Sequence, residues 1–190
     1  MSKIAVFISG EGSNLKHIVE NISSEVEVCM VYSNSSKAEG AKYSESKGIH
    51  TISIDTKKYY DKEVKENEMV RLLGKHDIDI IVLAGYMEKI PNKLLNNYKV
   101  LNLHPSILPK HKGLRAIEKS FEDESAIGGI SYHWCNENFD DGEIIEQFEI
   151  TKRGDFNKYH EDIKKTEWGT YYQVIEKVLG IREQFKIKIH

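Results

Sequence analysis

The sequence predicts an α/β protein with an open, mostly parallel sheet and helices on both faces. Up to about residue 100, short apolar runs alternate with segments of helical periodicity, which is typical of parallel strands joined by right-handed crossovers. Residues 78–84 are apolar with little alternation, as in a central strand covered on both sides. Beyond residue 101 two alternating segments flank a turn and predict antiparallel strands. The whole pattern is Rossmann-like and ends in a long C-terminal helix.

Each strand is predicted from an apolar run and its boundaries. The first run is followed by the glycine turn Gly10-Glu11-Gly12, and the last two flank Asp140-Asp141-Gly142, a sequence typical of turns. Pro105 lies two residues after the end of the fifth predicted strand and cannot continue its hydrogen-bond ladder. The predicted strands are residues 3–9, 26–33, 49–54, 78–84, 99–103, 127–135 and 143–150.

Each helix is predicted from apolar residues that recur on one face, together with end signals. Gly48 is suited to end the second helix, and Pro91 to begin the fourth. In the third helix the predicted apolar side consists of Val64, Met69, Leu72 and Leu73. The predicted helices are residues 14–22, 38–47, 61–75, 91–97, 117–121 and 156–179. Residues 181–189 form a tail with no assigned structure.

Length and composition predict a soluble cytoplasmic protein. At 190 residues the chain is predicted to be one domain, with halves of about residues 1–100 and 101–190. The net charge of −3 argues against nucleic-acid binding. Cys29 and Cys135 lie in apolar runs without metal-ligand spacing, so we expect two free thiols and no metal site. We find neither a signal sequence nor a membrane-spanning stretch, and monomer and homodimer both stay open.

The most informative motif is Asn102-Leu103-His104-Pro105, at the end of the fifth predicted strand. Residues two apart in a strand point to the same face, so the amide of Asn102 and the imidazole of His104 would lie side by side. In open α/β sheets, ligands bind beyond the carboxyl ends of the strands. The pair suits a reaction that builds negative charge on a carbonyl oxygen. The alternative is an ordinary strand end with a capped turn.

A second motif is the glycine turn that leads into the first helix. Glycine allows close approach of the backbone to a ligand, and a helix N-terminus attracts phosphate, with Ser13 and Asn14 as added donors. The turn lacks the third glycine of a dinucleotide fingerprint, because Leu15 takes that place, and it lacks the lysine of a Walker loop. One interpretation is that Gly12, Ser13 and Asn14 bind phosphate. The alternative is a simple glycine turn followed by a serine cap.

A third motif is the carboxylate of Asp140 in the turn after the strand that carries His133. Facing Asn102 and His104, this carboxylate would raise the pKa of the imidazole and stabilise its charged form. The alternative is a solvated hairpin turn.

Together and in this order, the motifs resemble the glycinamide ribonucleotide formyltransferases, folate-dependent enzymes of purine biosynthesis. The resemblance runs from residue 3 to about 179 and includes two further segments, Val82-Leu83-Ala84-Gly85-Tyr86-Met87 and Gly128-Gly129-Ile130-Ser131-Tyr132-His133. It implies transfer of a formyl group from 10-formyltetrahydrofolate to the amine of glycinamide ribonucleotide by direct attack, with no metal. It also implies a phosphate-binding N-terminal half and a catalytic, folate-binding C-terminal half.

The resemblance also implies roles for individual residues. Asn102 and His104 would donate to the oxyanion, while Asp140 would keep His104 charged and assist proton transfer. The residues implied in binding the ribonucleotide are Gly12, Ser13, Asn14, Gly85, Met87 and Glu167. The residues implied in binding the folate are Met87, Glu88, Ile90, His133, Cys135, Asn136 and Asp140.

Three positions depart from the family pattern. Glu88 stands where an arginine is usual, and Arg115 and Ile117 stand where histidines are frequent. These departures leave open a related formyltransferase that acts on another amine, such as an amino sugar nucleotide. A catalytically silent protein that binds a phosphate metabolite is the alternative outside the enzymes.

Overall fold

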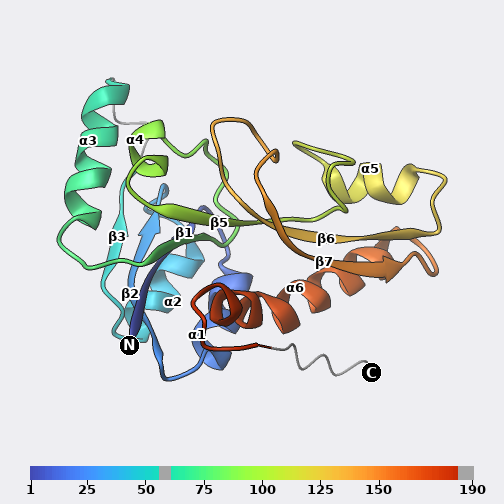
Figure 1. Cartoon of the computed structure of the whole chain (residues 1–190), viewed down its shortest axis with the longest axis horizontal. Coiled ribbons are helices and arrows are strands. Elements are labelled where there is room, and N and C mark those ends of the chain that lie inside the picture. Colours follow the sequence, from blue (N-terminus) through green and yellow to red (C-terminus); the bar gives the residue numbers. More distant parts are fainter. Residues whose placement is uncertain (56–60, 184–190) are drawn as a thin grey trace. The chain divides into compact units, whose positions relative to one another are not determined.

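The computed structural model describes residues 1–55 and 61–183 (Figure 1). The strands are β1 (Ser2–Ile8), β2 (Val26–Ser33), β3 (Thr51–Ser53), β4 (Ile80–Leu83), β5 (Lys99–His104), β6 (Ile127–Trp134) and β7 (Ile144–Thr151). The helices are α1 (Ser13–Asn21), α2 (Glu39–Ser46), α3 (Lys62–Leu73), α4 (Asn92–Leu95), α5 (Ala116–Glu122) and α6 (Phe156–Val178). The predicted fold class is confirmed, and each predicted element ends within about two residues of the observed one.

The strands form a mixed sheet in the order β3-β2-β1-β4-β5-β6-β7. The pairs β1–β2, β1–β4 and β2–β3 are parallel, and β6–β7 is antiparallel. By packing, the chain divides into two compact units, Met1–Leu101 and Asn102–His190. The organisation of the chain as one functional domain stays a prediction.

In the first unit, strand order determines which helices share a face. The connections β1-α1-β2 and β2-α2-β3 step in one direction across the sheet, and β3-α3-β4 steps back. Because such crossovers are right-handed, α1 and α2 cover one face and α3 covers the other, as Figure 1 shows. The middle of β1 is therefore enclosed, and its residues 4–8 are fully buried.

The ends of the first unit's helices follow from their sequence. The carboxylate of Asp61 accepts hydrogen bonds from the N–H groups of Glu63 and Val64, at 2.7 and 3.3 Å, and starts α3. Gly48, with φ +73°, follows α2 as expected. The prediction of the apolar side of α3 was wrong for Val64, which is 54% exposed, whereas Met69 and Leu73 are buried. Val64 lies in the first turn, just after the cap.

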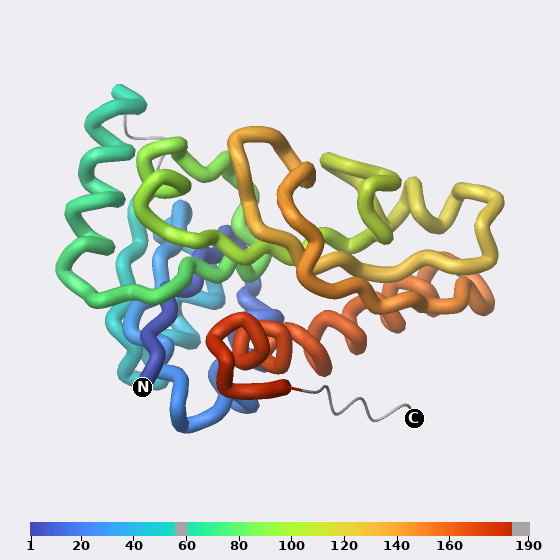
Figure 2. Tube along the Cα trace, viewed as in Figure 1, coloured from blue at the N-terminus to red at the C-terminus, as the bar shows by residue number. Residues whose placement is uncertain are grey.

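In the second unit, the hairpin β6–β7 packs against α6, and Figure 2 follows the chain from one to the other. The hydroxyl of Tyr132 lies 2.8 Å from Oγ1 of Thr170 on α6. Gly128 permits a closer approach, because a Cβ there would lie 1.9 Å from the hydroxyl of Tyr159. These contacts pack the start and the middle of β6 against α6.

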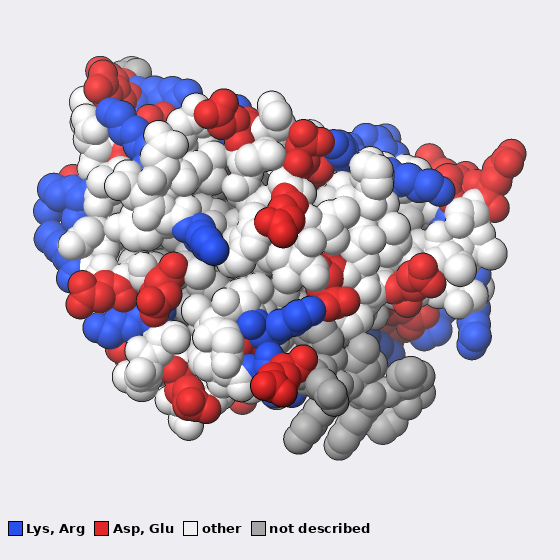
Figure 3. Space-filling model, in the orientation of Figure 1, with Lys and Arg blue, Asp and Glu red and all other residues white. Residues whose placement is uncertain are grey.

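The remaining expectations concern the surface and the tail. Lysine and arginine alternate with aspartate and glutamate over the face drawn in Figure 3. Among the helices of the described residues, none combines the length and apolarity required to cross a bilayer. Most of the predicted tail, from residue 184 on, lies outside the described residues.

Candidate active site

Two predicted catalytic residues lie at the carboxyl end of β5. Asn102 and His104 share a face of that strand, and His104 is 4% exposed. Nδ2 of Asn102 lies 3.1 Å from Nε2 of His133 on β6. Nδ1 of His133 lies 3.0 Å from the carbonyl oxygen of Trp134. That oxygen can only accept, so Nδ1 donates to it and Nε2 accepts from Asn102. An amide nitrogen has two hydrogens, so Asn102 is oriented and keeps a second N–H for a ligand.

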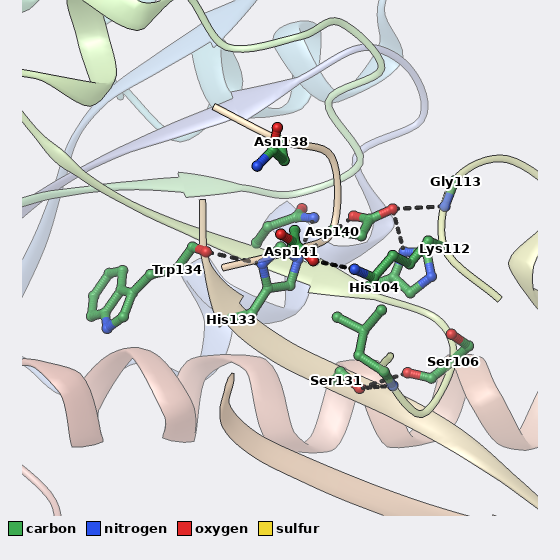
Figure 4. Close-up of polar contacts among 12 residues, drawn as sticks. His104, Ser106, Lys112, Gly113, Ser131, His133, Trp134, Asn138, Asp140 and Asp141 are labelled. Atoms are coloured by element: carbon green, nitrogen blue, oxygen red, sulfur yellow. Dashed lines mark hydrogen bonds and ion pairs between the residues drawn. The ribbon is translucent and has the colours of Figure 1, made fainter. Parts of the chain in front are cut away.

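The third predicted catalytic residue, Asp140, lies beside both histidines (Figure 4). Its Oδ2 is 3.3 Å from Nδ1 of His104, and its Oδ1 is 3.6 Å from Nε2 of His133. Oδ2 also accepts a hydrogen bond from the N–H of Gly113, at 2.8 Å. Asp140 adopts a left-handed backbone with φ +50°, which aspartate tolerates better than most residues. The structure thus brings Asn102, His104 and Asp140 together, and it places His133 beside them.

Burial and charge act in opposite directions on this cluster. Burial raises the pKa of Asp140, but His133, the N–H of Gly113 and the charge on His104 outweigh it and lower that pKa to about 2. Burial lowers the pKa of His104, and Asp140 and the carbonyl of His111 only partly oppose this. Asp140 therefore raises the pKa of His104 as expected, yet the net shift is downward. A negative charge formed nearby would restore the imidazolium.

The predicted phosphate turn lies in the first unit, where α1 begins. Gly12 has φ +72°, and a Cβ on it would lie 2.7 Å from Cα of Gly40. No acidic residue occupies the first turn of α1, so the positive end of the helix is not neutralised there. Ser13 is the first helical residue, and Asn14 is 8% exposed. The turn thus presents backbone N–H groups in a form that only glycine permits.

The segment from Gly85 to Ile90 follows β4 in the same unit. Gly85 has φ +79° and turns the chain. The N–H of Met87 donates to Oγ of Ser9 at 2.8 Å, which ties this segment to the end of β1. The Met87 side chain is 77% exposed and available to a ligand, whereas Ile90 is buried and offers only its backbone.

Glu88, the main departure from the family pattern, is paired inside the first unit. Its carboxylate accepts a hydrogen bond from Nζ of Lys65 on α3, and the hydroxyl of Tyr86 lies 3.5 Å from it. Burial is the main reason that the pKa of Tyr86 is raised, so its hydroxyl stays protonated and can donate. The negative charge of Glu88 is thus balanced by a cation from another element, which a sequence pattern cannot reveal.

The other predicted binding residues lie in the second unit. Burial, with the charge of Asp140, raises the pKa of Cys135 to about 12, so its thiol stays protonated. Nδ2 of Asn136 donates to the carbonyl of Asp141 at 3.2 Å and shapes the turn. Glu167 is 2% exposed on α6 and accepts from Nζ of Lys164 at 3.1 Å. Glu167 is thus buried and paired with Lys164, not a solvated helix residue.

The two other departures from the family pattern lie at the start of α5. Arg115 precedes α5 with φ +59° and an exposed side chain, and Ile117 is partly exposed on that helix. The described residues hold no group of three or more histidine, cysteine, aspartate or glutamate side chains suited to a metal ion.

Sequence reasoning missed His111, whose carbonyl oxygen lies 2.9 Å from Nε2 of His104. The signal was a second histidine in the polar loop that follows the motif.

Comparisons with known proteins agree with the motifs. A family model described as formyl transferase matches residues 2–175. Phosphoribosylglycinamide formyltransferase of Bacillus subtilis (strain 168) is 32% identical over 97% of this chain and 98% of its own length. The trifunctional purine biosynthetic protein adenosine-3 of Homo sapiens is 34% identical over 81% of this chain, but over only 16% of its own length. The crystal structure of phosphoribosylglycinamide formyltransferase from Streptococcus pneumoniae TIGR4 superposes with a TM-score of 0.87, at 31% identity, over 94% of this chain and 99% of that one.

Proposed function

The chain belongs to the formyl transferase family, and we propose that it transfers a formyl group from 10-formyltetrahydrofolate to the amine of glycinamide ribonucleotide. A relative and a solved structure named phosphoribosylglycinamide formyltransferase match nearly the full length of the chain. The observation that carries the chemistry is the cluster of Asn102, His104 and Asp140, in which an amide donor lies near an imidazole–carboxylate pair.

The reaction begins with attack of the substrate amine on the formyl carbon. A C–N bond forms, and the carbonyl electron pair moves to oxygen and gives a tetrahedral intermediate. The free N–H of the Asn102 amide would donate to that oxyanion, and the positive charge of the His104 imidazolium, whose two nitrogens face Asp140 and the His111 carbonyl, would stabilise it. Burial lowers the pKa of His104 and a developing oxyanion raises it, so the charged ring is stabilised most when the negative charge is greatest.

The intermediate then collapses. The carbonyl forms again, the bond from carbon to the folate nitrogen breaks, and the proton lost by the amine passes to the leaving nitrogen. Asp140, with its pKa of about 2, stays ionised throughout and would keep the imidazole oriented and assist this transfer. No covalent intermediate with the protein is required.

Each unit would supply its own binding residues. In the first unit, Gly12, Ser13 and Asn14 would bind the ribonucleotide phosphate through backbone N–H groups and side-chain donors at the start of α1. Gly85 and Met87 would contact the ribonucleotide, and Met87, Glu88 and Ile90 would contact the folate. In the second unit, His133, Cys135, Asn136 and Asp140 would contact the folate, and Glu167 would accept ribose hydroxyls.

The two other hypotheses are less well supported. A silent binding protein has no need for a buried histidine, His104, aligned with the carboxylate of Asp140. The departures that suggested a different amine are locally accommodated, because Glu88 is paired with Lys65 and the side chain of Arg115 is exposed. We therefore favour glycinamide ribonucleotide as the acceptor.

A spectrophotometric formyl-transfer assay tests the proposal. Wild-type protein should turn over glycinamide ribonucleotide with a 10-formyl folate, and Asn102→Ala should lower kcat by about 10²–10³, the usual loss for one oxyanion donor. Asn138→Ala, in the turn before Asp140, is a control that should keep near-normal kcat. Turnover of an amino sugar nucleotide in place of the ribonucleotide, or no turnover by folded protein, would refute the proposal.

A further inference from the structure

The ring of His104 is held from two sides. Nδ1 faces the carboxylate of Asp140 at 3.3 Å, and Nε2 faces the carbonyl oxygen of His111 at 2.9 Å. Both neighbouring groups accept hydrogen bonds, so they compete for the single proton of the neutral ring. The direction of the His111 carbonyl therefore decides which nitrogen carries that proton and how the ring lies.

The backbone at His111 needs support to keep this direction. His111 has φ +55°, a left-handed conformation that is uncommon for residues other than glycine. Nε2 of its ring lies 2.7 Å from Oδ2 of Asp123, at the end of α5. This contact joins the loop to a helix end, and so it stabilises the unusual conformation.

Asp123 is itself firmly held. Oδ1 accepts from Nζ of Lys152 at 2.5 Å and from the N–H of Ser125 at 2.9 Å. Nζ of Lys152 also donates to the carbonyl oxygen of Asp123 at 3.2 Å. The Lys152 side chain is 7% exposed, and its backbone N–H is bonded to Ala126 at 2.9 Å. Hydrogen bonding to Lys152 lowers the pKa of Asp123 more than burial raises it, so the carboxylate stays charged.

The same short segment also holds Asp140. Two residues after His111, the N–H of Gly113 donates to Oδ2 of Asp140 at 2.8 Å. Lys112 between them pairs with Asp141. Figure 4 shows Gly113 beside Asp140 and Lys112 beside Asp141. One segment therefore contacts both members of the His104–Asp140 pair.

We propose that His111 is a positioning residue: anchored through Asp123 to Lys152, it holds the segment 111–113 that orients both His104 and Asp140. This inference rests on the proposed formyl transfer and extends it to residues that do not touch substrate. Groups that hold a functional side chain in position commonly contribute about tenfold to hundredfold to activity.

Kinetics of matched variants test the inference. His111→Leu removes the bond to Asp123, and His111→Gln keeps an N–H donor on a side chain of similar reach. We expect kcat to fall about tenfold to hundredfold in His111→Leu, with KM within about twofold, and His111→Gln to recover most of that loss. Asp123→Asn, nearly identical in shape, should act like His111→Leu. Glu146→Gln, which breaks the pair of Glu146 with Lys177 on β7 and α6, should keep normal kcat.

The pH profile gives a readout that a merely structural role would not move. The titratable groups facing His104 are Asp140 from the turn before β7, His133 from β6 and His111 itself. The carbonyl of His111 supports the charged ring, so its displacement lowers the pKa of His104 further. The alkaline limb of kcat should shift to lower pH in His111→Leu and not in Glu146→Gln.

A measurement without substrate separates the two proposals. Nitrogen NMR of the histidine rings should show the His104 proton on Nε2 in the wild type and a larger share on Nδ1, facing Asp140, in Asp123→Asn. If wild-type protein fails to transfer formyl groups, the proposed function falls and this comparison still tests the anchor. Unchanged kcat, pH profile and ring protonation in both His111→Leu and Asp123→Asn would overturn the inference.

Discussion

The candidate sites of the two units are built in different ways. In the second unit, side chains contact one another: Asn102, His104, His133 and Asp140 are linked by distances of 3.1–3.6 Å. In the first unit, the turn before α1 relies on the backbone, with Gly12 at φ +72° packed against Gly40. The arrangement in the second unit depends on the identity of its side chains. The turn in the first unit depends on the absence of a Cβ at Gly12.

The difference predicts how each site responds to change. A site of mutually bonded side chains loses chemistry when one group is replaced, while its backbone stays in place. A backbone site loses shape when a side chain is added, and the loss appears in binding. The following predictions compare the two directly.

The largest effect is expected for Asp140→Asn, which keeps shape and tolerates the left-handed backbone. Without the carboxylate, His104 loses the charge that opposes its low pKa, so kcat should fall by about 10³ and the alkaline limb of the pH profile should shift to lower pH. Steady-state kinetics from pH 5 to about pH 9 would measure both. Asp141→Asn, which alters the pair with Lys112, is the neighbouring control with a small effect. A normal rate in Asp140→Asn would remove that residue from the mechanism.

An intermediate effect is expected for Gly12→Ala. The added Cβ meets Gly40 at 2.7 Å and forces a change in the turn. Hydrogen bonds to a charged group contribute about 1.5–3 kcal/mol each, so loss of one raises KM for the ribonucleotide about tenfold to hundredfold, with a smaller change in kcat.

Gly48→Ala provides the matched control for that substitution. Gly48 has φ +73°, close to that of Gly12, but a Cβ there meets nothing within 4 Å. Initial-rate kinetics should show a normal KM in Gly48→Ala, although the backbone strain is comparable. An equal rise in KM in both variants would mean that strain, and not the phosphate turn, is responsible.

The smallest effect concerns stability in acid. The pKa of Asp140 is lowered in the folded protein to about 2 from an ordinary value of 3.8, so its contribution is present above about pH 4 and is lost as the pH falls towards 2. After allowance for screening, we expect wild type to exceed Asp140→Asn in free energy of unfolding by about 1–2 kcal/mol at pH 6. Urea unfolding at pH 6 and at pH 3 would measure the difference. A gap that widens in acid would contradict this assignment.

Much of the fold could be predicted because its signals are local. Buried runs such as Ile80–Leu83, the glycine after α2 and the turn at Asp140 each act over a few residues. Where a boundary depends on partners, prediction was weaker: β3 spans only Thr51–Ser53, the residues that pair with β2, although the apolar run around it is longer. Val64 is apolar yet exposed, because the capped start of α3 leaves it facing solvent.

The candidate site was predictable to the extent that residue types carry chemistry. Asn102, His104 and Asp140 could be found from spacing and from the resemblance to a family. The pairing of Glu88 with Lys65 spans 23 residues, and that of Asp123 with Lys152 spans 29, so no local pattern marks either contact. His111 was not predicted, because its proposed role depends on its left-handed backbone and on its contacts with His104 and Asp123.

The bond from the N–H of Gly113 to Asp140 has a consequence for observing the protein at work. An amide proton shared with a carboxylate has a resonance that depends on the ionisation and position of that carboxylate. Gly113 is thus a built-in spectroscopic reporter, one residue removed from the chemistry and present without any label. Because the same segment carries His111, its signal would also register the arrival of a ligand beside His104.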